Sequence, residues 1–260
     1  MNDNPALPVE AGGGAASWSN PSDAMIAFER IRDAAVSEQE ICVAVSAKAQ
    51  ATHLLACLSA VHAQTYHGLE LVLVEEYPHP HAGQAEAWLV AHAARFGRVL
   101  RVCSAQGQGL AEMRNAAFAH ARASQVFVLS ADDEIYPRCI SRLADAMLES
   151  GCEAAYVQSV IADETLRLGD ADIWQQDALA VENYIGASAL ISKLAWREVG
   201  GYTPLAGGDT THDFWCKFVE HGFSGAFVPE MLCRSRRDEA AAGPAGSNIE
   251  MLLRHPWLKS

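Results

Sequence analysis

The chain has 260 residues, half of them apolar, and it carries a formal net charge of −13. This length is enough to bury one sizeable hydrophobic core. The acidic balance argues against a protein that neutralises nucleic-acid phosphates, which would show a basic patch, and it disfavours electrostatic docking on an anionic membrane.

The beginning of the chain predicts little packed structure. The first 20 residues are rich in Gly, Ala, Pro and Asn, a composition that predicts a disordered leader. Residues 21–38 predict a helix, because Ser22 or Asp23 can cap it and apolar side chains follow at helical spacing as far as about Val36. This helix is expected to pack on the domain that follows.

The body of the chain, residues 39–237, alternates short apolar runs with amphipathic segments. This alternation predicts an α/β domain whose single, mostly parallel sheet is flanked by helices. Residues 238–260 predict a mobile loop followed by a short C-terminal helix and tail. Strands are expected at 41–45, 69–74, 99–102, 126–129, 154–161, 185–191 and 225–229. Helices are expected at 54–62, 85–96, 110–122, 138–150, 212–221 and 248–254, with one more that follows residue 191 and ends at 199.

One apolar run, 126–129, stops abruptly at three acids, Asp132, Asp133 and Glu134. Open α/β sheets bind ligands at the C-terminal ends of their strands. Carboxylate oxygens suit Mg²⁺ or Mn²⁺, and such an ion can bridge protein acids and a nucleotide diphosphate. The alternative is a solvated acidic turn that caps the next helix.

The seven cysteines are scattered, with none of the close Cys-x-x-Cys spacing of a zinc site, and their number is odd. They are expected to be reduced thiols of a cytoplasmic protein. No apolar run is long enough to suggest a transmembrane segment, and no signal-peptide pattern stands out.

Eight short blocks follow one another in a characteristic order and spacing. They are 41–45, 58–66 (ending in Gln-Thr-Tyr), 71–76, 109–115, 129–133, 199–202, 213–222 and 228–232. Together they resemble a family 2 glycosyltransferase of the GT-A, or nucleotide-diphospho-sugar transferase, fold. The resemblance implies transfer of a sugar, in the manner of a hexosyltransferase, from a nucleotide-diphosphate donor to a hydroxyl of a glycan or glycoconjugate acceptor, usually with inversion.

The resemblance also implies which residues hold the donor. Asp132 matches the last acid of the family's Asp-x-Asp block and would bind Mn²⁺ or Mg²⁺, with assistance from Asp133. Ser130 stands where the family usually has the first aspartate, and it can donate a hydrogen bond but supplies no charge. Ser46, at the end of the first strand, joins the same nucleotide-sugar site.

Two further positions complete the implied donor site. Glu75 and Glu76 replace a pair of aspartates, of which the second would read the nucleobase by accepting from uracil or guanine. Arg114 matches the arginine of the family's Arg-Asn block and would contact the diphosphate or hold an acid nearby. The alternatives are a solvated strand end for Glu75 and a surface salt bridge for Arg114.

The expected catalytic base is missing from its usual place. The family has an acidic pair before an Asp-Leu-Trp stretch, but Thr210 and Thr211 occupy those positions here. A carboxylate is needed to deprotonate the acceptor hydroxyl near neutral pH. Asp209 is the first candidate and Asp213 the second, and the absence of any working base is a third alternative.

Two other functions remain open. In the first, the chain is a catalytically degenerate GT-A module that binds nucleotide sugar or serves as a partner subunit. A homo-oligomer or a partner protein is compatible with the transferase as well. In the second, it is a nucleotidyltransferase on a similar sheet. The nucleotidyltransferase predicts a Gly-rich, basic phosphate loop after the first strand, whereas residues 46–50 read Ser-Ala-Lys-Ala-Gln.

Overall fold

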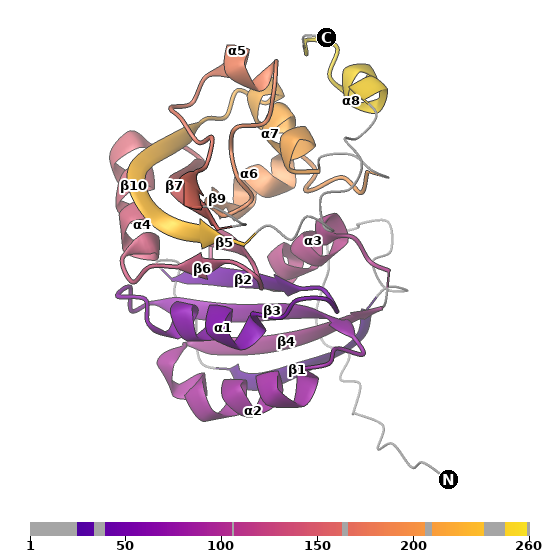
Figure 1. The fold of residues 1–260 in the computed structure, drawn as a ribbon, viewed down its shortest axis with the longest axis vertical. Coiled ribbons are helices and arrows are strands. Elements are labelled where there is room, and N and C mark those ends of the chain that lie inside the picture. The colour runs from indigo at the N-terminus through magenta and orange to yellow at the C-terminus, as the bar shows by residue number, and fades with distance from the viewer. Residues whose placement is uncertain are drawn as a thin grey trace.

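The computed structural model describes residues 25–33, 40–105, 107–162, 166–205, 210–236 and 248–258. Over these residues the chain forms one ten-stranded sheet with helices on both faces (Figure 1). None of the described helices has the length and apolar character that crossing a bilayer requires.

The strands and helices alternate through the first half of the chain. The strands are β1 (Met25–Asp33), β2 (Ile41–Ala47), β3 (Leu69–Tyr77), β4 (Arg98–Ala105), β5 (Gln125–Ser130), β6 (Glu134–Ile135), β7 (Ala154–Ala162), β8 (Leu166–Leu168), β9 (Ala189–Ser192) and β10 (Gly225–Ser235). The helices are α1 (Leu54–His62), α2 (Ala82–His92), the 3₁₀ turn η1 (Ala93–Arg95), α3 (Leu110–His120), α4 (Cys139–Ser150), α5 (Gln176–Leu179), α6 (Lys193–Glu198), α7 (Thr210–Glu220) and α8 (Asn248–Arg254).

The order of strands in the sheet is β1-β4-β3-β2-β5-β9-β7-β10-β6, and β8 pairs with β7 beside this path. The central strands β4, β3, β2 and β5 are parallel, as are β7 and β10, while β9 joins β5 to β7 by antiparallel pairing. The expected α/β class, one sheet with helices on both faces, is confirmed.

The sheet separates two hydrophobic cores, and alternate residues of β2 face opposite ones. Val43 and Val45 pack in the core that α1, α2 and α4 cover. Cys42 and Ala44 pack in the core that α3, α6 and α7 cover. All seven residues of β2 are buried, which explains why this strand is an unbroken apolar run in the sequence rather than an alternating one.

The expected helix over 21–38 is wrong where the structure describes it, because 25–33 is the strand β1. It pairs antiparallel with β4, which would otherwise be the outermost strand on that side. The pairing satisfies backbone groups of β4 that the parallel sheet leaves open, and the aromatic and β-branched residues of the segment suit a strand. The expected leader and capping residues lie outside the described residues.

Three other segments differ from expectation. Residues 166–180, where the sequence predicted neither a strand nor a helix, contain β8 and α5. The strand expected from residue 185 begins at Ala189. Most importantly, β10 runs past the expected end at Pro229 to Ser235, with irregular pairing around Met231, and its last part pairs with β6. This extension brings the end of β10 against the segment that follows β5.

Candidate functional site

Three polar side chains project from one face of the sheet at the C-terminal ends of adjacent parallel strands. Ser46 of β2 is in register with Ser130 of β5, and Glu76 belongs to β3 on the other side of β2. On each strand the residue two positions earlier lies in the core beneath α3: Ala44, Val74 and Val128. Since side chains alternate along a strand, Ser46, Glu76 and Ser130 share that face.

The hydroxyl of Ser46 is buried without a hydrogen-bond partner. The residue is 3% exposed, and no atom of the described chain bonds to its Oγ. Leaving a buried polar group unpaired costs about 1–3 kcal/mol, so native structures seldom contain one without a reason. A ligand atom at the end of β2 would satisfy this hydroxyl.

Glu76 ties together the loops that follow the two neighbouring strands. Its Oε2 accepts from the backbone N of Ala49, after β2, at 2.9 Å. Its Oε1 accepts from the backbone N of Gly107, after β4, at 2.7 Å. A carboxylate has about four lone-pair positions, so these two bonds leave acceptor capacity for a further N–H donor.

Glu75 lies on the opposite face of β3 from Glu76. Its side chain is fully buried and pairs with Arg101 of β4, whose Nη1 donates to Glu86 of α2 at 3.0 Å. Burial raises the pKa of Glu75 although the guanidinium of Arg101 opposes the shift. The structure thus separates the two glutamates, and the alternative of a solvated strand end is wrong because Glu75 is buried in an ion pair.

Asp132 holds the segment that leads into α1. Its Oδ1 accepts from the backbone N of Thr52 at 3.0 Å and from the backbone N of His53 at 3.3 Å, and it lies 3.3 Å from His53 Nδ1. The Asp132 side chain remains 30% exposed, so it can still meet a ligand. It is placed at the end of β5, as the sequence predicted.

Asp133 points into the protein instead. Its Oδ1 accepts from the backbone N of Arg236 at 3.3 Å, and its Oδ2 accepts from Ser188 Oγ at 3.4 Å. Burial raises the pKa of Asp133 to about 6, against the hydrogen bonds that favour its charged form. The two neighbouring aspartates therefore serve different segments of the chain.

These contacts decide how well the acids fit the expected divalent ion. Within the described ranges, no group of three or more His, Cys, Asp or Glu side chains is placed to hold a metal ion together. Asp132 is bonded to the entrance of α1, and Asp133 is bonded towards β10. Asp133 thus does not join Asp132 in the Mn²⁺ or Mg²⁺ site expected of the pair, whereas Asp132 keeps part of its carboxylate exposed.

Arg114 of α3 is buried beneath the same face of the sheet. Its Nη1 donates to Thr211 Oγ1 at 3.1 Å, and its guanidinium carbon lies 5.3 Å from the centre of the Tyr202 ring. The residue is 5% exposed, so the alternative of a surface salt bridge is wrong. A threonine hydroxyl thus meets this guanidinium at the position where an acid was expected.

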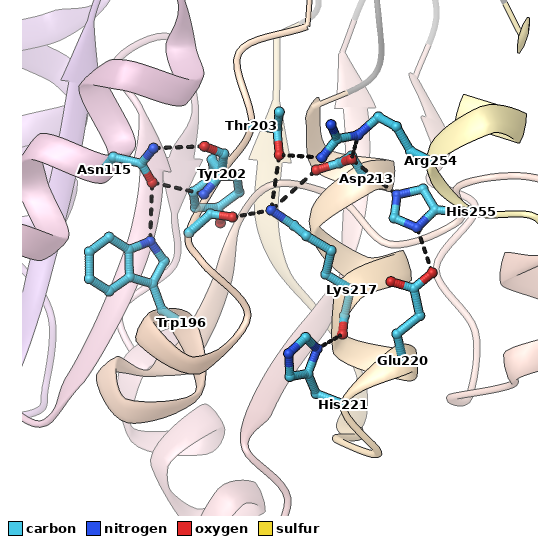
Figure 2. Close-up of polar contacts among 11 residues, drawn as sticks. Asn115, Trp196, Tyr202, Thr203, Asp213, Lys217, Glu220, His221, Arg254 and His255 are labelled. Carbon is cyan, nitrogen blue, oxygen red and sulfur yellow. Dashed lines mark hydrogen bonds and ion pairs between the residues drawn. The ribbon is translucent and has the colours of Figure 1, made fainter. Parts of the chain in front are cut away.

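Asp213 is a structural anchor between α7 and α8 (Figure 2). Its Oδ1 accepts from Arg254 Nε at 2.6 Å and lies 3.0 Å from His255 Nε2, while Oδ2 lies 3.2 Å from Lys217 Nζ. Burial alone would raise the pKa of Asp213, but hydrogen bonds from His255 and others, with the charge of Lys217, hold it well below its usual range. A carboxylate with so low a pKa is a weak base. Because Asp213 is also buried, it is poorly suited to take a proton from an acceptor hydroxyl.

Asp209, the first candidate base, lies outside the described residues, which resume at Thr210 in the first turn of α7. The described part of the chain therefore places Thr210, Thr211 and Asp213 on α7 without placing Asp209.

Two contributors to this region were not singled out from the sequence. Asn115 joins α3 to α6 and the turn after it, since its Oδ1 accepts from Tyr202 N at 2.8 Å and from Trp196 Nε1 at 3.2 Å (Figure 2). Arg236, beyond the end of β10, bonds to the acids that follow β5. In the sequence, the Arg-Asn block pointed to Asn115, and the run Arg-Ser-Arg-Arg at 234–237 was an available signal for Arg236.

The comparison with family models gives one match to much of the chain. The model described as "Glycosyl transferase family 2" matches residues 42–191. This interval runs from β2 into β9 and includes the strand ends that carry Ser46, Glu76, Ser130 and Asp132. No curated protein matches the chain.

Solved structures share the fold at low sequence identity. Residues 1–349 of Staphylococcus aureus TarS in complex with UDP-GlcNAc match with a TM-score of 0.63 and 10% identity, over 77% of this chain and 59% of that one. The mannosyltransferase PcManGT from Pyrobaculum calidifontis, in complex with GDP-Man and Mn²⁺, matches with a TM-score of 0.60 and 17% identity, over 81% of this chain and 61% of that one. The chain thus spans about 60% of the length of these structures.

Proposed function

The chain belongs to glycosyl transferase family 2, and from this premise we propose that it transfers a sugar from a nucleotide-diphosphate donor to a hydroxyl of a glycan or glycoconjugate acceptor, with inversion. The observation that carries the proposal is the set of polar side chains at the ends of β2, β3 and β5. Among them, the buried and unpaired hydroxyl of Ser46 is the group that most needs a ligand. We place the protein in the cytoplasm, where its seven free cysteines would stay reduced.

In this proposal Glu76 reads the nucleobase. Uracil, thymine and guanine each carry a ring N–H that can donate to a carboxylate, whereas cytosine and adenine carry none at neutral pH. The remaining acceptor capacity of Glu76 suits that N–H, and the two loops it holds would enclose the base. The structures of TarS with UDP-GlcNAc and of PcManGT with GDP-Man support donors of this kind.

The transfer is a single displacement. The acceptor oxygen attacks the anomeric carbon from the side opposite the diphosphate, and the new C–O bond forms as the bond between the anomeric carbon and the phosphate oxygen breaks. The electron pair of the broken bond leaves with the diphosphate. The proton of the acceptor hydroxyl goes to a carboxylate base, and we assign this role to Asp209, because Asp213 is enclosed by cations.

The leaving diphosphate also needs a positive counter-charge. The structure of PcManGT with GDP-Man and Mn²⁺ supports a divalent ion as one source, and Asp132 is the exposed acid at which one would be sought. A divalent ion, when bound, would act as a Lewis acid towards the diphosphate. The described residues bring no three metal-binding side chains together here, and the chain also offers Arg236 as a cation, bonded to the backbone oxygen of Asp132.

One observation favours a second candidate function, a degenerate module that binds nucleotide sugar without transferring it. Thr210 and Thr211 stand at the start of α7, and Thr211 is already bonded to Arg114. A chain without a working base would keep donor affinity and lose transfer. It would then act as a partner subunit of another enzyme.

Donor binding is tested first, with isothermal titration calorimetry of UDP, GDP, TDP and CDP against the whole chain. We expect one of the nucleotides with a ring N–H to bind, and Glu76→Gln to weaken it at least tenfold, since a hydrogen bond to a charged group is worth about 1.5–3 kcal/mol. Asp145→Asn, which changes an exposed acid on α4, is the matched control. Absence of binding by every nucleotide to folded protein would overturn the proposal.

Transfer is tested next, with the sugar forms of the nucleotide that binds. Release of the nucleoside diphosphate in the presence of glycan acceptors, abolished in Asp209→Asn with donor affinity kept, is the result expected of an enzyme. Donor binding with no transfer to any acceptor, and with no effect of Asp209→Asn, would favour the degenerate module instead.

A further inference from the structure

The extended end of β10 carries a guanidinium into the acidic segment after β5. Because β10 continues to Ser235, its end lies beside β6 (Figure 1). Cys233 and Arg234 of β10 pair with Ile135 and Glu134 of β6. The next arginine along, Arg236, is thereby set beside the segment 132–134.

Arg236 makes a contact with each of the three consecutive acidic residues. Its Nη2 donates to Glu134 Oε2 at 2.8 Å, its Nη1 lies 3.5 Å from the backbone oxygen of Asp132, and its backbone N donates to Asp133 Oδ1 at 3.3 Å. A guanidinium has five N–H groups, so these contacts orient the side chain and still leave donors for a ligand. The side chain is 21% exposed, so a ligand can reach it.

Each of these acids already has a partner within the chain, although Asp132 keeps part of its carboxylate exposed. Asp132 Oδ1 accepts from the backbone before α1, and Asp133 is bonded to Ser188 and to the backbone of Arg236. Glu134 is bonded to the guanidinium of Arg236. A divalent ion placed among these acids would also lie close to the guanidinium of Arg236, whose repulsion would offset part of the attraction of the carboxylates.

We propose that the guanidinium of Arg236 supplies the positive charge for the donor diphosphate, so that donor binding and transfer by this chain need no divalent metal. The inference rests on the proposed function and deepens it. Arginine suits the role because its planar fork donates two parallel hydrogen bonds to phosphate oxygens and remains charged at every physiological pH. When the sugar–phosphate bond breaks, the electron pair that stays on the diphosphate meets this charge, and no co-reactant is required.

The test uses the whole chain and measures the affinity for UDP and GDP by calorimetry, in EDTA and in MnCl₂. For the wild type we expect the dissociation constant of the nucleotide that binds to change less than about threefold between the two conditions, because the cation is part of the protein. Arg236→Gln should weaken binding in EDTA at least about tenfold, since a charged hydrogen bond to phosphate is lost. Arg236→Lys keeps the positive charge but lacks the planar pair of N–H donors. Its nucleotide affinity in EDTA should lie between those of the wild type and Arg236→Gln.

The matched control is Arg234→Gln. Arg234 is also next to Glu134, with Nη1 3.9 Å from Oε2, but it lies within the β10–β6 pairing rather than beyond it. Arg234→Gln should bind nucleotide with a dissociation constant within about threefold of the wild-type value. Near-ultraviolet circular dichroism checks that every variant is folded. Equal losses in Arg234→Gln and Arg236→Gln would overturn the inference, since they would indicate a general effect of charge.

A second variant tests whether a bound metal ion can replace the positive charge of Arg236. Arg236→His removes the fixed charge and adds an imidazole next to Asp132, and imidazole is a good ligand of transition metals. We expect this variant to bind nucleotide weakly in EDTA and to recover affinity in MnCl₂, unlike the wild type.

The outcomes separate this inference from the proposed function. A wild type that binds nucleotide in MnCl₂ and loses it in EDTA would overturn the role of Arg236 and leave the proposed transferase standing. Nucleotide binding that persists unchanged in Arg236→Gln would do the same. Absence of nucleotide binding in both conditions would overturn both proposals.

Discussion

Nε of Arg254, the last residue of α8, donates a hydrogen bond of 2.6 Å to Oδ1 of the buried Asp213 of α7. The next residue, His255, continues the contact, with Nε2 3.0 Å from Asp213 and Nδ1 2.7 Å from Glu220 (Figure 2). The C-terminal helix is thus fastened to α7 by charge. Since α7 also carries Thr211, which bonds to Arg114, the contacts between α8 and α7 help to hold Thr211 and Arg114 in place.

The first prediction concerns Asp213→Asn. Losing this carboxylate leaves Lys217 and Arg254 without their buried counter-charge, and breaking a buried pair from one side costs about 3–5 kcal/mol. We expect a loss towards the lower end of that range, because the Arg254 side chain is 36% exposed. Urea unfolding measures it, and a change within 0.5 kcal/mol of the wild type would contradict the anchoring role.

The second prediction concerns pH. Burial lowers the pKa of His255, but hydrogen bonds to Asp213 and Glu220 and the charges of both carboxylates outweigh it and raise the pKa above its ordinary value of 6.5. A raised folded-state pKa means that the charged imidazole stabilises the fold fully below 6.5 and loses this contribution as the pH rises through the raised value.

The melting temperature should therefore fall between pH 6.5 and pH 9 more in the wild type than in His255→Gln, which cannot gain or lose a proton. Differential scanning calorimetry at half-unit steps of pH measures this difference. Parallel profiles for the two proteins would show that His255 does not stay charged between its two carboxylates.

The third prediction distinguishes the two adjacent glutamates of β3. Glu75→Gln should destabilise the fold by about 3 kcal/mol, because it leaves the nearly buried Arg101 without its closest counter-charge. The remaining Arg101–Glu86 pair should keep the loss from being larger, and nucleotide affinity should be kept. Glu76→Gln should show the reverse, with weaker nucleotide binding and a smaller loss of stability. Unfolding in urea and calorimetric titration of both variants make the comparison.

The fourth prediction concerns Gly201, which adopts φ +70° in the turn before Tyr202. A Cβ there would lie 2.7 Å from Asn115 Oδ1 and 3.1 Å from Trp196 Nε1. Gly201→Ala should thus cost about 1–3 kcal/mol from backbone strain, and more if Asn115 is displaced. Gly186→Ala is the control, because no neighbouring atom lies within 4 Å of the added Cβ. Equal thermal stability of the two variants would contradict the close approach of Asn115.

The centre of the sheet was predictable because its strands are unbroken apolar runs that end in polar residues. The runs 41–45, 69–74 and 126–129 all appear as buried parallel strands. The edges were not predictable in this way, because β1 and the far end of β10 depend on which strand lies beside them. Local sequence patterns contain little information about such distant pairing.

The candidate site was predictable to a similar degree. Ser46, Glu76, Ser130 and Asp132 follow from where strands end. The separation of Glu75 from Glu76 was already implied by the two-residue period of a strand, although the motif as a whole suggested that they act together. The run Arg-Ser-Arg-Arg indicated a group of cations, but the position of Arg236 in the site was not predictable, because it depends on the irregular pairing around Met231.

The antiparallel strand β1 has a consequence for how copies of the chain meet one another. A parallel α/β sheet that ended at β4 would present a row of open N–H and C=O groups, which is a template for strand addition between molecules. β1 covers that row and offers in its place an edge whose second half reads Glu-Arg-Ile-Arg-Asp, where charge discourages further addition. A chain shortened to begin at residue 40 should for this reason aggregate at concentrations that the longer chain tolerates, even though the shortening removes none of the residues at the ends of β2, β3 and β5.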